Sequence, residues 1–155
     1  MKTDHVTPLD HVNPVTAAEI VNEFLRLIMI PDPAAASRYT AADMKILFTG
    51  KRAMREPADC TKFNASRYKW VKKKIERTEV VASSVQYGAN SGGAASDGDI
   101  VYSLGTLYGE WPDGTPFEGN RYVDRYVVKN GLITHMDVWN DSAEWLMVRA
   151  GLAKL

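Results

Sequence analysis

Residues 115–141 read TPFEGNRYVDRYVVKNGLITHMDVWND, and this stretch decides the fold. Two runs rich in Tyr, Val, Ile and Trp are separated by Asn130-Gly131, a dipeptide typical of a two-residue type I′ hairpin turn. Such a turn needs positive φ at both positions, which Asn tolerates and Gly adopts freely. The sequence therefore predicts a β-hairpin whose register is set by the turn.

In the expected register, Lys129 pairs with Leu132 and the pairing continues without interruption. Directly opposed residues place their side chains on the same face of a sheet. One face, the expected acid–base face, would carry Tyr122, Asp124, Tyr126, Ile133, His135, Asp137 and Trp139. The other, the expected arginine face, would carry Arg121, Val123, Arg125, Val127, Thr134, Met136 and Val138. Neither face is uniformly apolar, so the local pattern does not decide which one lines a cavity.

Composition narrows the class of protein. The chain has 155 residues, which suits one domain with its own core. Its 19 basic and 19 acidic side chains cancel, so the overall charge does not favour a nucleic-acid partner. The single cysteine, Cys60, excludes an internal disulfide, and the sequence lacks both a long apolar run and a charged-then-apolar leader. We expect a cytoplasmic protein with no nucleic-acid or membrane partner.

Residues 1–15 mix Pro, Asp, His and Asn without periodicity and are predicted to form a flexible N-terminal arm, followed by a single domain over residues 16–155. His5 and His11 have no third ligand at a fixed spacing, so we expect no metal site.

Helix signals dominate the first part of the domain. Thr16 and Glu19 form a capping box that predicts a helix over residues 16–30, and Asp32 is expected to cap a short second helix. After a short strand over residues 44–48, another helix is predicted to begin at Pro57 and to continue through an apolar stripe as far as Ile75. The run of three lysines at residues 72–74 would then be a solvated surface beside that stripe.

Strand signals follow. The pattern predicts strands over residues 79–87 and 99–111, separated by a flexible loop at 88–98, and then the hairpin. Gly105 and Gly109 mark expected bulges or bends. A final helix is expected to begin at Asp141 or Ser142 and to end at Gly151. The order predicts an α+β domain with helices gathered on one face of a curved antiparallel sheet.

This order resembles the nuclear transport factor 2-like superfamily, which includes SnoaL-like polyketide cyclases, phenazine-biosynthesis A/B-like proteins, ketosteroid isomerases and limonene epoxide hydrolases. The motifs that carry the resemblance are Gly119-Asn120-x-Tyr122-Val123, Asn130-Gly131-x-Ile133, and Asp141 before the last helix. The resemblance implies a cystatin-like roll in which a curved sheet wraps around the N-terminal helices to form a conical pocket.

The resemblance also implies that the arginine face is internal. Arg121 and Arg125 would then be cationic donors in a mainly apolar pocket, where they would attract a carboxylate, phenolate or enolate. Tyr102 and Lys45 are candidate proton donors, and the expected substrate-binding residues are Val123, Met136, Val138, Tyr68 and Trp70. At the positions of the acid–base residues of the best-known relatives stand Leu27, Phe48 and Val138 instead.

The expected function is a cofactor-independent lyase, isomerase or cyclase acting on a small hydrophobic, aromatic or polyketide-like substrate, with elimination through a phenolate or enolate as one route. We expect a homodimer. His135 with Asp137 and Asp124 is the alternative catalytic set, because an imidazole near a carboxylate can act as a general base. A non-catalytic ligand-binding or dimerisation module is the alternative function, since a fold does not determine an activity.

Overall fold

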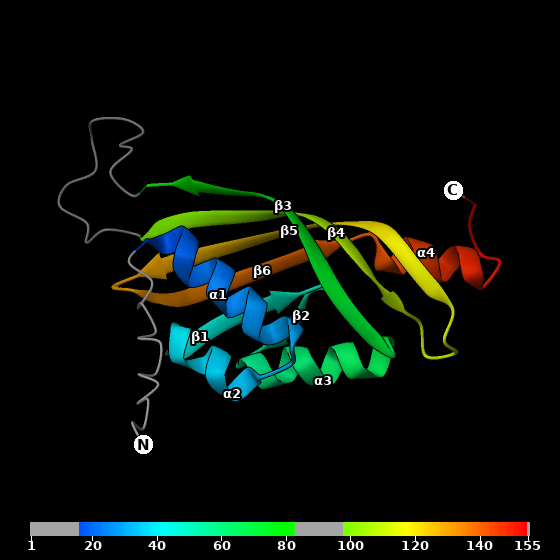
Figure 1. The fold of residues 1–155 in the computed structure, drawn as a ribbon, viewed down its shortest axis with the longest axis horizontal. Coiled ribbons are helices and arrows are strands. Elements are labelled where there is room, and N and C mark those ends of the chain that lie inside the picture. The colour runs from blue at the N-terminus through cyan, green and yellow to red at the C-terminus, as the bar shows by residue number, and fades with distance from the viewer. Residues whose placement is uncertain (1–15, 83–97, 155) are drawn as a thin grey trace, which may run out of the picture.

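The computed structural model describes residues 16–82 and 98–154 (Figure 1). The predicted arm at residues 1–15, and the predicted loop up to residue 97, lie outside the described residues. The elements in chain order are α1 Ala17–Met29, α2 Pro33–Ala36, a 3-10 turn Ser37–Tyr39, β1 Thr40–Phe48, β2 Arg52–Met54, α3 Pro57–Arg67, β3 Trp70–Val81, β4 Asp99–Glu110, β5 Pro116–Lys129, β6 Leu132–Asn140 and α4 Ser142–Arg149.

The strands form one six-stranded sheet in the order β2-β1-β6-β5-β4-β3. All neighbouring pairs are antiparallel except β1 and β6, which run parallel. The predicted α+β class is confirmed, while the sheet is mixed rather than purely antiparallel. Figure 1 shows α1, α2 and α3 on one side of the twisted sheet, with α4 at the opposite end from the start of α1.

The first two helices begin where the sequence predicts. Thr16 Oγ1 accepts a hydrogen bond from the Glu19 backbone N–H at 3.2 Å, and the Glu19 carboxylate accepts one from the Thr16 backbone N–H at 2.9 Å, which completes the capping box. Asp32 Oδ1 accepts the Ala35 N–H at 2.9 Å at the start of α2. The inner stripe of α1 includes Phe24 and Leu25, which are fully buried against the sheet.

The predicted long helix from Pro57 ends early. The α3 helix stops at Arg67, and residues 70–81 form the strand β3 instead of continuing the apolar helical stripe. Along β3 the less exposed positions alternate as Val71, Lys73 and Ile75, which is the period of a strand. Pairing with the whole of β4 outweighs the weak helical spacing. The interpretation of residues 72–74 as one solvated surface is therefore wrong.

The hairpin turn forms as predicted, but the register changes beyond it. Asn130 and Gly131 have φ of 50° and 75°, and Lys129 pairs with Leu132. Val127 then pairs with His135, so Thr134 is an extra residue in β6, a β-bulge. A one-residue shift reverses the faces of all following side chains. The predicted face assignment is therefore wrong for the second strand from His135 onward, while Ile133 shares a face with Tyr126 as predicted.

After the bulge, each face combines residues from both expected sets. The inner face, covered by the helices, carries Tyr122, Asp124, Tyr126, Ile133, Met136 and Val138, all of them buried. The outer face carries Arg121, Val123, Arg125, His135, Asp137 and Trp139. The inner face thus holds the tyrosines and Asp124 of one expected set with the apolar residues of the other.

Gly105 in β4 lies where β3 bends closely over its neighbour. The β3–β4 register shifts between Ile75 and Arg77, opposite Gly105 and Leu104. A Cβ atom on Gly105 would lie 2.0 Å from the backbone oxygen of Lys74, so this close approach of the two strands needs glycine. Among the described residues, no helix has the length and apolar character needed to cross a membrane.

Candidate functional site

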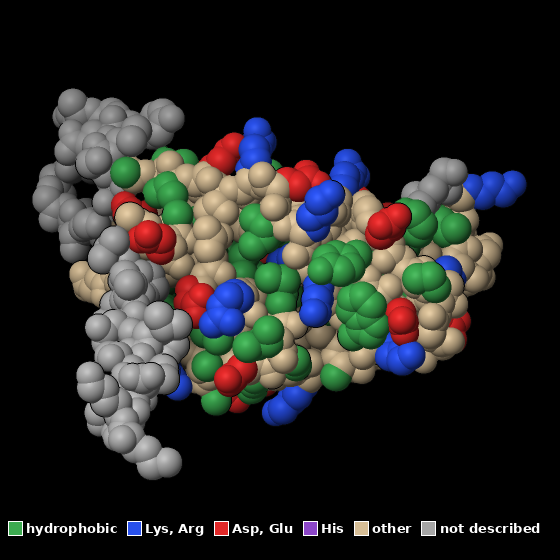
Figure 2. Space-filling model, viewed as in Figure 1, with side chains coloured by type: hydrophobic (Ala, Val, Ile, Leu, Met, Phe, Trp, Pro, Cys, Tyr) green, Lys and Arg blue, Asp and Glu red, His purple; other side chains and the backbone are tan. Residues whose placement is uncertain are grey.

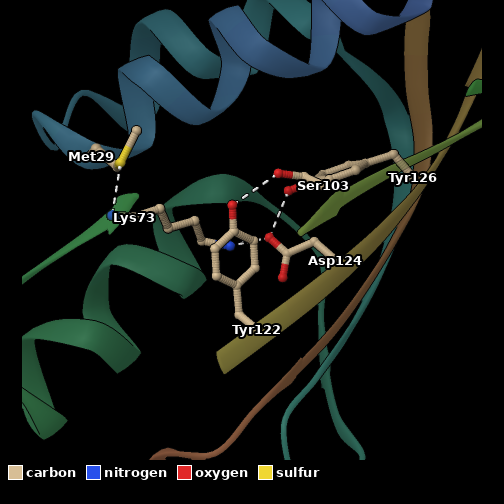
Figure 3. A network of polar contacts seen from close by, with 6 residues as sticks. All are labelled: Met29, Lys73, Ser103, Tyr122, Asp124 and Tyr126. Carbon is tan, nitrogen blue, oxygen red and sulfur yellow. Dashed lines mark hydrogen bonds and ion pairs between the residues drawn. The ribbon is translucent and has the colours of Figure 1, made fainter. Parts of the chain in front are cut away.

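A cluster of polar side chains lies inside the core, on the inner face of β3, β4 and β5 (Figure 3). On β5, residues two apart share a face, so alternation brings Tyr122, Asp124 and Tyr126 to the same side. Ser103 lies opposite Asp124 on β4. Asp124, Tyr126 and Ser103 have no exposed surface and Tyr122 is 2% exposed. Buried polar groups require partners, and their contacts define the site.

Asp124 is the centre of these contacts. Its Oδ2 atom forms an ion pair with the Nζ atom of Lys73 and accepts a hydrogen bond from the Tyr126 hydroxyl at 3.0 Å. The Lys73 ammonium also lies 4.0 Å from the centre of the Tyr122 ring, within the range of a cation–π interaction. The Tyr122 hydroxyl shares a hydrogen bond with Ser103 Oγ at 3.0 Å.

The second carboxylate oxygen of Asp124, Oδ1, is buried and has no hydrogen-bond partner among the described residues. A carboxylate oxygen can accept more than one hydrogen bond, and leaving a buried acceptor unpaired costs free energy. Lys73 also has N–H donors left over, because an ammonium has three N–H groups and, among the described residues, Asp124 alone receives a hydrogen bond from it. The cluster therefore keeps one acceptor oxygen and two N–H donors without a hydrogen-bond partner among the described residues.

Lys73 reaches this cluster because β3 is a strand. Its side chain points inward, where it is 16% exposed, while the neighbouring Lys72 and Lys74 are exposed. The Lys73 backbone N–H donates to the Sδ atom of Met29, at the end of α1, over 3.1 Å (Figure 3). Met29 thus connects the end of the first helix to the strand that carries the lysine.

Burial keeps the neighbouring acids protonated. The pKa of Tyr126 is well above its ordinary value, first because of burial and then because of the adjacent Asp124 carboxylate. Burial raises the pKa of Tyr122 to about 12. The Cys60 thiol, also in this part of the core, has its pKa raised to about 12 by burial and by the charge of Asp124. At neutral pH the two phenols are hydrogen-bond donors and Cys60 is not a nucleophilic thiolate.

Two cavities share part of their walls, and Lys73 of the cluster lines the inner one. The inner pocket has a volume of about 50 Å³, and its wall includes Lys73, Cys60, Leu107, Met136 and Val138. An outer groove of about 560 Å³ lies between the end of α1, α3 and the start of β3. Both cavities are lined by Ile28, Met29, Asn64, Tyr68, Val71 and Lys72. Figure 2 shows this face of the molecule, where apolar side chains gather over α1 and β3 with lysine and arginine side chains among them.

A second polar group lies beside the inner pocket. The Tyr68 hydroxyl donates to Ser142 Oγ at 2.6 Å, and the amide of Asn120 lies 3.3 Å from the same oxygen. Asn120 is fully buried, and its Oδ1 atom has no partner among the described residues. The Ser142 backbone N–H donates to Asn140 Oδ1, which ties this group to the start of α4. The group provides a polar contact near the pocket, away from Asp124.

The two arginines predicted to enter the pocket lie on the outer face. Arg121 is 82% exposed and pairs with Asp141 at 2.7 Å. Arg125 is 30% exposed and pairs with Asp137 at 3.0 Å. The reason is the bulge at Thr134, because the inner partners of Met136 and Val138 are Tyr126 and Asp124 rather than the arginines. The predicted internal position of both arginines is therefore wrong.

The other candidate catalytic residues also lie away from the cluster. His135 is exposed, with its Nδ1 atom 2.9 Å from Thr134 Oγ1. Asp137 accepts the bond from Arg125, Tyr102 lies opposite Arg125 on the outer side of β4, and Lys45 is exposed on β1. The alternative set of His135, Asp137 and Asp124 does not meet in space, because Asp124 points to the inner face.

The expected substrate-binding residues divide between the two faces. Met136 and Val138 line the inner pocket, Tyr68 lines both cavities and Trp70 lines the outer groove. Val123 points to the outer face and is 36% exposed. Met136, Val138, Tyr68 and Trp70 therefore line cavities where a ligand could contact them, and their role in binding stays a prediction.

Sequence reasoning missed Lys73 and Ser103. The signal for Lys73 was the alternation of Val71, Lys73 and Ile75, which a helical interpretation obscured. Ser103 carries no distinctive pattern, and only its place opposite Asp124 makes it part of the cluster. Among the described residues, no group of three or more His, Cys, Asp or Glu side chains is arranged to hold a metal ion.

Scans against protein-family models and curated proteins find no match. Solved structures do match. An NTF2-like protein from Burkholderia thailandensis has a TM-score of 0.61 at 17% identity, over 88% of this chain and 97% of that chain. A Catenulispora acidiphila protein with a ketosteroid isomerase-like fold, solved with trimethylamine, has a TM-score of 0.59 at 16% identity, over 80% and 86%. TerC, co-crystallised with polyporic acid, has a TM-score of 0.60 at 13% identity, over 83% and 93%.

These likenesses place the chain in the class of α+β folds in which helices cover one face of a twisted sheet. Within that class, the chain has the nuclear transport factor 2-like fold, as its sequence resemblance predicted. Identities of this size establish the fold alone, so the function has to be argued from the chain's own residues.

Proposed function

We propose that the protein is a cofactor-independent enzyme that performs acid–base chemistry on a small hydrophobic molecule, with Asp124 as the proton acceptor. The observation that carries the proposal is the buried Asp124 carboxylate. Its Oδ2 atom is paired with Lys73, a residue of the inner pocket wall, and its Oδ1 atom has no partner among the described residues. The pKa values of the neighbouring Tyr122 and Tyr126 are raised, and titratable groups with shifted pKa values cluster at functional sites.

The chemistry follows from the contacts. Oδ1 of Asp124 can remove a proton from a carbon next to a carbonyl or from a phenol, while the spare N–H of Lys73 donates to the oxygen that becomes negative. The Tyr126 hydroxyl holds the carboxylate in place. This is the step that isomerases, cyclases and lyases acting through an enolate or phenolate share. Low water access strengthens each electrostatic contact.

The substrate class is proposed from the cavity walls. The inner pocket and the outer groove are lined mostly by apolar and aromatic side chains, which suits an aromatic or polyketide-like molecule. Two proteins of similar fold were solved with small organic molecules, trimethylamine and polyporic acid, which supports the cavity as a ligand site. A ligand of that size needs the groove as well as the inner pocket, since the inner volume is only about 50 Å³.

The test is hydrogen–deuterium exchange at the carbons next to the carbonyl of 2-tetralone, a hydrophobic ketone, followed by NMR in D₂O. We expect the wild-type protein to accelerate exchange and Asp124→Asn to lose at least about tenfold of that rate, since a positioned base contributes that much or more. Asp43→Asn, an exposed residue of β1, is the matched control and should keep the rate. Equal rates in wild type and Asp124→Asn would remove Asp124 from the role.

A ligand-binding module without catalysis is the second candidate. The ion pair between Lys73 and Asp124 favours it, because a paired buried carboxylate can be purely structural. In that case 2-naphthol would bind the wild-type protein while 2-tetralone shows no accelerated exchange. We also propose that the protein is a cytoplasmic homodimer joined through the outer face of the hairpin, where Trp139 is 54% exposed.

A further inference from the structure

Lys73 differs from the surface lysines in its surroundings. Its side chain is part of the wall of the apolar inner pocket and is 16% exposed, and its Nζ atom lies 4.0 Å from the centre of the Tyr122 ring. Leu107, Met136 and Val138 form other parts of the same wall. A primary amine in such a desolvated setting, next to a group that can take its proton, has what a nucleophilic lysine needs.

We propose that Lys73 is a covalent nucleophile that forms an imine with a hydrophobic aldehyde or ketone. The inference shares the pocket of the proposed function and adds to it a substrate class, carbonyl compounds, and a bond between protein and ligand. The iminium ion draws electrons from the neighbouring carbon more strongly than a hydrogen-bonded carbonyl does. It therefore makes the same proton removal by Asp124 easier.

The step balances within the residues at hand. The Lys73 ammonium passes one proton to the Asp124 carboxylate, with which it is already paired. The free amine adds to the carbonyl carbon, and the nitrogen's proton moves to the oxygen to give a neutral carbinolamine. Asp124 then returns its proton to the hydroxyl, which leaves as water while a C=N⁺ bond forms. Ammonium and carbonyl have become iminium and water, and no oxidant or cofactor is consumed.

The partners of Asp124 suit this exchange. A buried ion pair differs from a neutral amine and carboxylic acid only by the position of one shared proton, and the loss of water on ligand binding disfavours the charged form. The Tyr126 hydroxyl donates to Oδ2, the oxygen paired with Lys73, and the buried Oδ1 has no partner among the described residues. Lys72 and Lys74 on either side are exposed, and no hydrogen bond or ion pair links either of them to a carboxylate among the described residues.

The experiment is reductive trapping in the wild-type protein. Benzaldehyde and sodium cyanoborohydride convert an imine to a stable benzylamine, and peptide mass spectrometry then measures the rate at each lysine. We expect Lys73 to be labelled at least about tenfold faster than the exposed Lys74 beside it, because binding and desolvation activate the inner amine. Formaldehyde, which is small and polar, should show no preference for Lys73. Benzaldehyde labelling of Lys73 that is no faster than that of Lys74 would overturn the proposal.

Lys73→Arg separates this inference from the proposed function. Arginine keeps a cation beside Asp124 but cannot form an imine. We expect the variant to lose the fast benzaldehyde label and most of the accelerated 2-tetralone exchange, while circular dichroism shows it folded. Full exchange in a folded Lys73→Arg would contradict the imine and leave Asp124 as the base. Absence of accelerated exchange in the wild type, with Lys73 still labelled, would instead contradict the proposed function alone.

Discussion

Lys73 forms its ion pair with Asp124 across an intervening strand. Lys73 belongs to β3 and Asp124 to β5, and β4 lies between them in the sheet. Asp124 is fully buried and the Lys73 side chain is 16% exposed. Removal of one partner from a buried pair leaves the other charge without compensation, which costs far more than the pair itself contributes.

Lys73→Met should therefore destabilise the protein by about 3–5 kcal/mol, the usual cost of an orphaned buried charge. The Lys73→Met, Asp124→Leu double variant should regain most of this loss, because neither charge remains. Urea unfolding of the single and double variants measures both quantities. A double variant as unstable as Lys73→Met would show that the pair is not the cause.

The outer pair of Arg125 and Asp137 provides the control. Its side chains are 30% and 25% exposed, and Arg125 lies on the same strand as Asp124. Arg125→Met should cost no more than about 1 kcal/mol, since partly exposed ion pairs contribute little. A cost equal to that of Lys73→Met would contradict the distinction between inner and outer faces.

Gly105→Ala should destabilise the fold and displace Lys73. An added Cβ would lie 2.0 Å from the Lys74 backbone oxygen, so β3 would have to move away from β4. We expect a loss of about 1–3 kcal/mol, typical of overpacking, with a parallel drop in benzaldehyde labelling of Lys73. Gly114→Ala, at a turn with φ of 83°, is a control that strains the backbone without touching β3. It should lower stability and keep the labelling preference.

Alkaline pH should destabilise the fold through Cys60 and Tyr122. The pKa of Cys60 rises from 9.0 to about 12 and that of Tyr122 from 10.0 to about 12, in both cases mainly through burial. A raised folded-state pKa means that the stabilisation is complete below the ordinary pKa and is lost as pH rises toward the folded one. Above the ordinary pKa, each group lowers the folding equilibrium constant roughly tenfold per pH unit.

Urea unfolding between pH 8 and pH 11 measures this slope. Cys60→Ala removes one of the two titrating groups, so its free energy of unfolding should fall less steeply with pH than that of the wild type. Parallel slopes for the two proteins would show that the thiol titrates alike in the folded and unfolded chains.

Trp139→Glu should dissociate the proposed dimer. Trp139 is 54% exposed on the outer face of the hairpin, and a carboxylate there would oppose burial against a second copy. We expect light scattering at micromolar concentration to give a dimer for the wild type and a monomer for this variant. Leu152→Glu, where the leucine is 75% exposed beyond α4, should stay dimeric. A monomeric wild type would remove the prediction.

Local signals in the sequence predicted much of the fold. The capping box at Thr16, the cap at Asp32 and the turn at Asn130-Gly131 depend on neighbouring residues only, and all three form as expected. The strand β3 was misread because Val71 and Ile75 fit a helical spacing as well as a strand, and pairing with β4 decided between them. Pairing between strands far apart in the sequence cannot be read from the local residue pattern.

The candidate site was less accessible for the same reason. Alternation along β5 correctly grouped Tyr122, Asp124 and Tyr126, but the bulge at Thr134 changed which residues of β6 join them. A bulge has no strict sequence signature, and a single extra residue exchanges the two faces. Lys73 could be recognised only after its strand and its inner face were known.

The bulge also sets which changes of gene length the pocket can tolerate. Thr134 has no pairing partner in β5, so deletion of its codon would leave Met136 and Val138 on the inner face. Insertion of one residue between His135 and Met136 would instead move Met136 and Val138 to the outer face and Asp137 and Trp139 to the inner face. Shortening and lengthening of the same strand are therefore not equivalent, and descendants of this gene should retain deletions at residue 134 far more often than insertions just after it.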